Sequence, residues 1–308
     1  MLAFSRKYYR SLEPLLKPVD YPQPLPWAEI FGRQAPLELE IGFGNGEYLN
    51  RASLMIPDHN FVGLEVAWAS LKRALRRLAT PPSHNNVKVI LTRAEVALER
   101  FFLPESLTVL RTLFPRPWPA ERQAGRRIFE RDFLNLVADR LESSGRFSLV
   151  TDSRKLADWV LAQAQGSALT LELAERPAEL NTKYERKWQG GGQQQFYHLT
   201  GYKNERAGRL EPIKETKMQA FYRDYLDPTT FSPRGCVEAV VVRFREFIFD
   251  PHRAEGLLRV FVIEDHLTQD FFIRLRQEPE GRWKVSPAVP GQVFPTIGVA
   301  RALELAAS

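Results

Sequence analysis

The glycine-rich segment LELEIGFGNGEYL, residues 37–49, combines residue types suited to holding a nucleotide-like ligand. Its apolar alternation leads into Gly42, Gly44 and Gly46, which is typical of a first β-strand that ends in a turn before a helix. Glycine allows a positive φ and lets a ligand come close to the main chain. The spacing is GxGxG, which differs from the dinucleotide fingerprint GxGxxG. Glu40, just before the turn, suits a ligand with sulfonium and ammonium charges better than a pyrophosphate.

Glu65 is a second acid with a candidate binding role. It lies 25 residues after Glu40, at the end of an apolar run. An acid at this place in a nucleotide-binding fold bonds the ribose hydroxyls of an adenosine ligand. The alternative is a solvent-facing carboxylate that opens a helix, where its charge is favourable in any case. With the glycine turn upstream, we favour the ligand role.

The segment FPRPWP, residues 114–119, has three prolines that stiffen a loop. A loop after a parallel strand lies at the edge of the sheet where ligands bind. A basic cluster follows it, formed by Arg122, Arg126, Arg127 and Arg131. Contacts to phosphate and an ordinary solvated face are equally compatible with this cluster.

Other polar segments give little signal by spacing alone. Thr151-Asp152 and the TKYE segment, residues 182–185, resemble plain loop residues. The five histidines show no metal-ligand spacing, and Cys236 is the single cysteine, so we expect no metal site and no internal disulfide. The net charge of +6 makes a polyanionic partner plausible. No apolar run approaches the roughly 20 residues of a membrane span, and no signal peptide is visible, so we expect a cytoplasmic protein without a membrane partner.

These candidate residues need a scaffold, and strand–helix alternation predicts one. After an N-terminal arm, residues 1–36, strands and helices alternate up to about residue 205, which favours an α/β domain with a parallel sheet covered by helices. Gly145 is a plausible stop for the last helix before the fifth strand. The predicted strands are 37–41, 60–66, 87–91, 106–113 and 146–151, and the predicted helices are 47–55, 67–78 and 128–142.

A second, β-rich C-terminal domain is predicted at residues 213–308. Its segments are rich in β-branched and aromatic residues, and Glu280-Gly281 predicts a turn between the last two. We expect an antiparallel array with a closing helix at 297–306. The predicted strands are 237–249, 257–264, 271–277 and 283–285.

Together, five segments resemble the bacterial tRNA guanine-N7 methyltransferase family. They are LEIGFGNGEYL, FVGLEV, the FPxPWP loop with its following RR, the DFL…L…G run into TD, and TKYE, in family order across about residues 37–199. The resemblance implies a Rossmann-like doubly wound methyltransferase sheet in residues 37–205. It also implies methyl transfer from S-adenosylmethionine to N7 of a variable-loop guanosine in tRNA.

The resemblance also implies roles for individual residues. The glycines of the turn, with Glu40 and Glu65, match the cofactor site, and Arg93 stands where a further cofactor contact is expected. Arg116 and Asp152 match the catalytic positions. The positions that match the substrate pocket or the tRNA contact are Asp152, Thr182, Lys183, Tyr184, Glu185, Arg122, Arg126 and Arg127.

Two motif acids of the family are arginines in this chain. The family loop is FPDPWP, where this chain has Arg116, and the third strand of the family leads into Asp-Ala, where this chain has Arg93-Ala94. Ala120 also replaces a basic residue of the family loop. Arginine has no acceptor, so Arg93 cannot accept a hydrogen bond from the adenine amino group. Positive charge near a sulfonium also weakens binding in a low-dielectric site.

Three hypotheses follow from these departures. The first is an active tRNA guanine-N7 methyltransferase with rearranged acids, because guanine N7 already carries a lone pair and needs positioning more than a general base. The product base gains positive charge, which Arg116 opposes and which Asp152 or Glu185 can offset. The second is a weakened or inactive relative that binds RNA. The third is an unrelated nucleotide-binding oxidoreductase, which the GxGxG spacing disfavours. We prefer the first.

Overall fold

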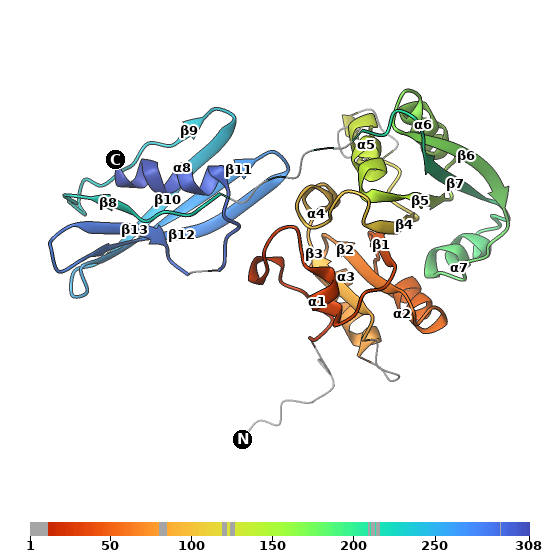
Figure 1. The fold of residues 1–308 in the computed structure, drawn as a ribbon, viewed down its shortest axis with the longest axis horizontal. Coiled ribbons are helices and arrows are strands. Elements are labelled where there is room, and N and C mark those ends of the chain that lie inside the picture. Colours follow the sequence, from red (N-terminus) through yellow and green to blue (C-terminus); the bar gives the residue numbers. More distant parts are fainter. Residues whose placement is uncertain are drawn as a thin grey trace, which may run out of the picture. The chain divides into compact units, whose positions relative to one another are not determined.

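The chain divides into two units, each with its own sheet (Figure 1). Unit 1 takes the described residues of Met1–Pro18 and Pro24–Pro212, and unit 2 those of Val19–Gln23 and Ile213–Ser308. The structure is a computed structural model. It describes residues 12–79, 85–118, 122–123, 127–208, 210, 213, 216–289 and 291–308.

Unit 1 is built on a seven-stranded sheet in the order β3-β2-β1-β4-β5-β7-β6. Strand β7 is antiparallel to both of its neighbours, and the other neighbouring strands are parallel. The strand order reverses between β1 and β4, which is where a doubly wound sheet opens a crevice for ligands. The expected Rossmann-like doubly wound sheet is confirmed. The strands are β1 (Leu37–Ile41), β2 (Asn60–Glu65), β3 (Val87–Leu91), β4 (Leu107–Leu113), β5 (Leu141–Thr151), β6 (Leu169–Arg176) and β7 (Phe196–Lys203).

Helices connect the strands, and those expected at 47–55 and 67–78 are confirmed to within one residue. The amphipathic helix at 68–78 buries one apolar stripe against β2 and β3. Every residue of β1 is buried, as expected for a central strand covered on both faces. The helices are α1 (Trp27–Phe31), α2 (Glu47–Met55), α3 (Trp68–Leu78), α4 (Ala94–Arg100), α5 (Arg131–Arg140), α6 (Arg154–Ala164) and α7 (Lys183–Gly190), with a 3-10 turn η1 (Pro18–Asp20).

The prediction of a helix at 128–142 that stops at Gly145 was wrong at both ends. Helix α5 ends at Arg140, and β5 begins at once with Leu141, which pairs with Leu107. A Cβ on Gly145 would lie 2.8 Å from the carbonyl oxygen of Leu107. Gly145 therefore allows two strands to approach closely at an irregularity, and it does not end a helix.

The N-terminal segment of unit 1 packs on the sheet through a few specific contacts. Leu15 forms an isolated parallel bridge with Val89 of β3. The indole of Trp27 donates to the carbonyl oxygen of Phe101 at 3.0 Å and stacks on Phe102. These contacts hold the segment against the first part of the domain without a long helix, in keeping with its frequent prolines.

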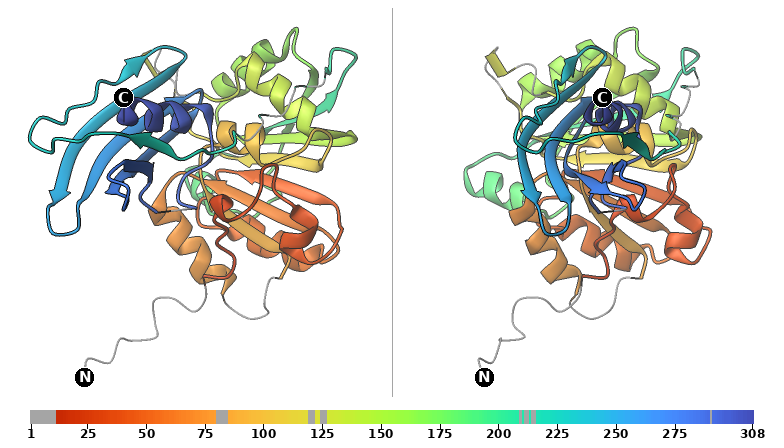
Figure 2. Two further views of the ribbon diagram at one scale, coloured as in Figure 1. Left: turned by 60° about the vertical axis from the view of Figure 1, so that its left-hand side comes forward. Right: turned by 90° about the vertical axis from the view of Figure 1, so that its left-hand side faces the viewer.

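Unit 2 is a six-stranded antiparallel sheet in the order β8-β13-β12-β11-β10-β9, with α8 across one face (Figures 1 and 2). Alternate residues of its strands form a core with α8. The β-rich prediction and its closing helix are confirmed. Within the described residues, no helix has the length and apolar character that a membrane crossing requires. The elements are β8 (Phe221–Arg223), β9 (Cys236–Val237), β10 (Val240–Asp250), β11 (Glu255–Glu264), β12 (Leu267–Gln277), β13 (Trp283–Pro287) and α8 (Ile297–Ala307).

Candidate active site

The glycine turn joins β1 to α2 with a backbone that side chains would strain. Gly42, Gly44 and Gly46 have φ values of 74°, 57° and 69°. A Cβ on Gly46 would lie 2.7 Å from the Cβ of Ala74 on α3, so the turn and α3 approach each other closely. A Cβ on Gly42 would meet no atom within 4 Å. The turn therefore faces open space at Gly42, which suits a ligand that approaches the main chain.

Glu40 is a buried acid whose carboxyl group is not fully satisfied. It is 3% exposed, and burial raises its pKa to about 8, with Glu65 adding to the rise and Arg111 and Arg51 opposing it. Its Oε2 has no hydrogen-bond partner among the described residues. An unsatisfied buried acceptor costs roughly 1–3 kcal/mol. A ligand group that donates a hydrogen bond or carries positive charge would remove this cost.

A residue on the neighbouring strand β4 explains why the Glu40 carboxyl group lacks a full set of hydrogen-bond partners. Arg111 on β4 is the register partner of Glu40, yet its guanidinium donates to the Glu38 carboxylate and to the Tyr48 hydroxyl. Glu38 also bonds Nδ1 of His59 at 2.8 Å. Glu38 and Arg111 were not among the residues expected from the sequence. Two acids at alternate positions of an apolar strand were the available signal, because such residues share one face of the sheet.

Glu65 ties the glycine turn to the start of α3. Its Oε2 accepts a hydrogen bond from the backbone N–H of Gly44 at 3.1 Å. Its Oε1 accepts from the N–H groups of Val66 at 2.8 Å and Ala67 at 3.0 Å. Glu65 therefore opens α3, as the alternative interpretation expected, and also lies against the glycine turn. Its contact with a ligand stays a prediction.

The TKYE segment forms the start of α7. Thr182 caps the helix by accepting from the N–H of Glu185 at 3.2 Å, and the Glu185 carboxylate accepts from the N–H of Thr182 at 2.8 Å. Glu185 is fully buried and also accepts from the N–H groups of Glu179 and Leu180. Its carboxylate is committed to the protein backbone. Lys183 and Tyr184 are the exposed members of the segment.

Two residues of α2 hold α7 in place. Glu47 accepts hydrogen bonds from the N–H of Lys183 at 3.0 Å and from Nη2 of Arg186 at 2.7 Å. Burial raises the pKa of Glu47, but the bonds from Arg186 and Lys183 outweigh burial and bring it below its usual value. Arg51 donates to the carbonyl oxygen of Leu180. Neither residue was expected from the sequence, although Glu47 directly follows the glycine turn.

The FPRPWP loop meets α7 through an aromatic contact. Phe114, at the end of β4, is buried, and its ring lies 5.9 Å from that of Tyr184 in a stacked arrangement. Phe114 also packs edge-on against Phe196 at 5.6 Å. The loop after β4 and the TKYE segment, about seventy residues apart in the sequence, are therefore neighbours in space.

The described arginines in and after this loop lie at its surface or hold it in place, and none of them takes the chemical role of the acid in the family motif. Arg116 is exposed, and its guanidinium carbon lies 5.6 Å from the ring centre of Trp118. Arg127 donates to the carbonyl oxygen of Trp118 at 2.9 Å and lies over the ring of Trp159, so it fixes the loop. Arg122 is exposed, and Arg126 lies outside the described residues.

Arg93 carries its own counter-ion. It precedes α4, its side chain is 56% exposed, and its Nη2 lies 2.6 Å from Oε1 of Glu95. Glu95 is largely buried and lies two residues after the position where the family motif has an acid. The Arg93–Glu95 pair places no net charge at the end of β3.

Asp152 follows β5 and is partly exposed. Its carbonyl oxygen accepts from Nε2 of Gln193 at 3.0 Å, and no hydrogen bond or ion pair within the described part of the chain engages its carboxylate. Within that part, no group of three or more His, Cys, Asp or Glu side chains forms a metal site. Because nothing in the described part of the chain engages it, the Asp152 carboxylate is available to a substrate.

The sheet topology brings most of these residues to one edge. The glycine turn, Glu65, Arg93, the FPRPWP loop and Asp152 follow the carboxyl ends of β1, β2, β3, β4 and β5, and all five strands are parallel. Helix α7 joins this edge through Glu47 and Tyr184. The edge offers a buried acid, an open turn, exposed aromatic surface and one uncommitted carboxylate.

Several known proteins that are similar to this chain are described as methyltransferases. Residues 34–198 match the family described as "Putative methyltransferase". The tRNA (guanine-N(7)-)-methyltransferase of Thermotoga maritima is 36% identical over 276 residues, 87% of each chain. The protein of the same name from Thermus thermophilus is 31% identical over 261 residues, 82% of each chain. The one from Chlorobium phaeobacteroides is 33% identical over 165 residues, 53% of this chain and 79% of that protein.

These sequence alignments differ in whether they are longer than unit 1. Alignments of 276 and 261 residues are longer than unit 1, so they include residues of unit 2. The alignment of 165 residues is shorter than unit 1.

Among solved structures, one described as "Structure of an Antibiotic Related Methyltransferase" is similar to this chain, with a TM-score of 0.46 and 19% identity. The match covers 57% of this chain and 92% of that chain.

Proposed function

Since the chain belongs to the tRNA (guanine-N(7)-)-methyltransferase family, we propose that it methylates N7 of a variable-loop guanosine in tRNA. S-adenosylmethionine would supply an activated methyl group on a positively charged sulfonium. The observation that carries the proposal is the buried, unsatisfied Glu40 carboxyl group beside an open glycine turn. Both features fit a cationic nucleoside ligand better than a pyrophosphate.

The cofactor side of the site rests on the ends of β1, β2 and β3. Glu40 would bind the positively charged part of the ligand, and its pKa would fall as the charge arrives. The space at Gly42 admits the ligand to the main chain. Glu65, held against the turn, suits ribose hydroxyls. Glu95 neutralises Arg93, so the charge penalty expected from the sequence is reduced.

The substrate side rests on the loops after β4 and β5 and on α7. Asp152 would stabilise the positive charge that develops on guanine when N7 uses its lone pair. The exposed Tyr184 ring, which stacks on buried Phe114, offers a surface for a base, and exposed Lys183 suits a phosphate or a carbonyl oxygen. Arg116 is exposed over Trp118 and suits the RNA backbone better than the reacting base. The residues position the base, and no proton needs to leave N7.

Transfer of a labelled methyl group from S-adenosylmethionine to unmodified tRNA tests the proposal. The product is mapped by reduction and aniline cleavage, which cut the chain at N7-methylguanosine. The natural chain is compared with the Arg93→Asp/Arg116→Asp double variant and with Asp152→Asn. We expect transfer by the natural chain, similar transfer by the double variant, and a strong loss for Asp152→Asn.

Two outcomes would contradict the proposal. Transfer by the double variant alone would identify an RNA-binding relative whose catalysis was lost at these arginines. Failure of the natural chain to bind S-adenosylmethionine by calorimetry would exclude a methyltransferase.

A further inference from the structure

One face of the unit 2 sheet is covered by α8, and the other carries arginines and aromatic rings. Leu258, Val260 and Val262 of β11 are at most 1% exposed and pack with α8. Because side chains alternate along a strand, Arg259 and Phe261 project from the opposite face. We name this surface the open face and define it by Tyr222, Arg243, Arg259, Phe261, Phe272 and Arg276.

The strand register places these side chains next to one another. Arg243 on β10 pairs with Phe261 on β11, and Arg259 pairs with Phe272 on β12. Further along, Arg276 on β12 pairs with Lys284 on β13, which pairs with Tyr222 on β8. Cationic and aromatic residues are therefore neighbours on adjacent strands of this face. Two acids share the face, because Asp270 pairs with Phe261 and Glu255 pairs with Arg276.

The rings of the open face are accessible and are flanked by guanidinium groups. Phe272 is 40% exposed and Tyr222 is 44% exposed. The guanidinium carbons of Arg245 and Arg259 lie 5.7 and 5.1 Å from the ring centre of Phe261. That of Arg282 lies 5.0 Å from the ring centre of Tyr222. Such surfaces bind unstacked bases, because every base has a face that can stack on a ring.

Positive charge on the open face is only partly neutralised. Arg259 pairs with Asp270 at 2.8 Å and lies 3.8 Å from Glu246. Arg282 pairs with Asp224 at 3.1 Å. Arg243, Arg245 and Arg276 are exposed, and none of them forms an ion pair with another described residue. A neutral or apolar partner would desolvate these charges without compensation. A second copy of the same face would add like charges. A phosphate backbone compensates them and releases its counter-ions.

We propose that the open face binds a single-stranded segment of RNA. Bases stack on Phe272 and Tyr222, and phosphates pair with Arg243, Arg276 and their neighbours. The inference rests on the proposed function in that the natural ligand is part of the substrate tRNA.

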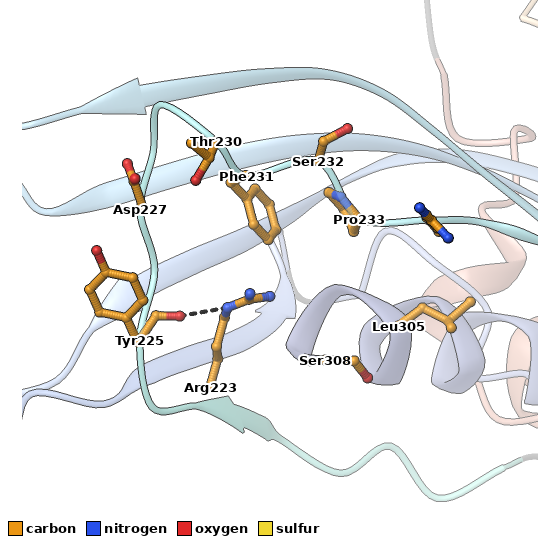
Figure 3. Close-up of a pocket in the computed structure, with 10 residues that line it drawn as sticks. Arg223, Tyr225, Asp227, Thr230, Phe231, Ser232, Pro233, Leu305 and Ser308 are labelled. Atoms are coloured by element: carbon orange, nitrogen blue, oxygen red, sulfur yellow. Dashed lines mark hydrogen bonds between the residues drawn. The ribbon is translucent and has the colours of Figure 1, made fainter.

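The cavity of about 360 Å³ on the α8 side of unit 2 is not part of the open face (Figure 3). Its Arg223 donates to the carbonyl oxygen of Tyr225 at 2.6 Å and to that of Ala306 in the last turn of α8. The guanidinium is thus already committed, and a helix C-terminus disfavours an anion. Leu305 and the exposed Arg234 also line this cavity. Tyr225 and Arg234 of this cavity, together with Arg301 of α8, supply matched controls.

Binding of a fluorescein-labelled ten-nucleotide uridine RNA to the full chain, without cofactor, tests the inference. Arg243→Gln/Arg276→Gln is expected to weaken binding at least about tenfold and to lower the salt slope of log K by roughly 1.4, since two phosphate contacts are lost. The control Arg234→Gln/Arg301→Gln removes two arginines on the α8 side. It is expected to change affinity less than about twofold and to leave the slope unchanged.

The stacking contribution is tested separately. Phe272→Ala is expected to weaken binding by about fivefold or more, whereas Tyr225→Ala, which removes an aromatic residue that is 72% exposed in the α8-side cavity, is expected to have little effect. Phe272→Tyr keeps a ring and should bind as the natural chain does. This conservative variant separates loss of stacking from loss of folding, together with thermal melting of each variant.

Three outcomes would overturn the inference. The natural chain fails to bind the oligonucleotide, the variants of both sides weaken binding equally, or Phe272→Ala dissociates a dimer in sedimentation. Failure of the proposed function is a different result. A chain that binds the oligonucleotide through the open face but transfers no methyl group retains the inference and loses the activity. A chain that methylates tRNA with the same KM in Arg243→Gln/Arg276→Gln retains the activity and loses the inference.

Discussion

The edge of the unit 1 sheet and the open face of the unit 2 sheet use opposite charges in opposite environments. In unit 1, the central feature is one acid, Glu40, which is buried and lacks a full set of partners. In unit 2, exposed arginines are spread over several strands. A single charge acts strongly where water is excluded, whereas exposed charges each contribute little and act together. Under the two proposals, the buried acid would hold a small cation tightly and the exposed arginines would hold a polyanion over a wide area.

Two buried glutamates of unit 1 differ in how many hydrogen bonds their carboxyl groups accept. Glu40 and Glu185 are both nearly inaccessible to solvent. Glu185 accepts hydrogen bonds from three backbone N–H groups, whereas Oε2 of Glu40 has none among the described residues. Burial by itself does not mark a ligand-binding acid. An acid that the fold leaves unsatisfied is the better candidate.

The largest expected effect comes from Glu40→Gln. It removes the carboxyl group that would ionise as the positively charged cofactor binds, and loss of one partner of a buried charge pair costs about 3–5 kcal/mol. We expect kcat/KM for S-adenosylmethionine to fall by roughly 100- to 1,000-fold. The matched control is Glu172→Gln, a substitution on the outer strand β6, which should leave kcat/KM within about twofold. Normal turnover by Glu40→Gln would remove Glu40 from the cofactor site.

The same variant has a pH-dependent effect on stability. Burial raises the pKa of Glu40 from 4.5 to about 8, so the folded protein keeps a proton that the unfolded chain releases in this range. The stability from this group is therefore present below about pH 4.5 and is lost as pH rises to about 8. Relative to the natural chain, Glu40→Gln should gain about 2–5 kcal/mol between pH 5 and pH 9. Urea unfolding at both pH values measures this, and an unchanged difference would contradict it.

Glu185→Ala should lower stability by about 2–4 kcal/mol. The substitution leaves the N–H groups of Glu179, Leu180 and Thr182 without their acceptor, at roughly 1–3 kcal/mol for each buried group that stays unsatisfied. Denaturant unfolding gives the loss. Glu179→Ala, which removes a half-exposed side chain, is the control and should cost less than about 0.5 kcal/mol. Equal losses for the two variants would contradict the capping role of Glu185.

Two glycines of the turn separate backbone strain from close approach. Gly42→Ala imposes a positive φ on alanine in open space, which costs about 1–2 kcal/mol. Gly46→Ala adds a contact with Ala74 that is too short, so it should cost about 1 kcal/mol more. Thermal unfolding compares them. If the two variants are equally stable, α3 yields to the new methyl group without cost.

The smallest expected effect is a difference between kinetic constants. Arg243→Gln/Arg276→Gln should raise KM for tRNA several-fold, because few of many phosphate contacts are lost, and should leave KM for S-adenosylmethionine unchanged. Glu40→Gln should show the reverse. Steady-state methyl transfer with each substrate varied in turn measures both. A parallel change of the two KM values in either variant would break the distinction between the two regions.

The sequence alone determined the strand–helix alternation of unit 1 and the location of the glycine turn. Glycine spacing predicted the turn at 42–46. Apolar periodicity predicted β1, α2 and β3 and the approximate positions of β10, β11, β12 and β13, whereas β8 and β9 were not predicted as separate strands. These features are local, because they depend on backbone preferences and on which side of an element is apolar. The order of the five motifs indicated the family, which the alignments then supported.

Only the tertiary structure decided which polar groups are committed and which remain available. Arg111 bonds Glu38 and leaves Glu40 unsatisfied, Glu95 neutralises Arg93, and Glu185 is occupied by the backbone. Gly145 allows β5 to come close to Leu107 of β4, and no local sequence pattern reveals this contact. The physical reason is that hydrogen bonds and burial depend on register and on neighbours distant in the sequence. The sequence names the chemical groups, and the packing of the sheet decides which of them meet.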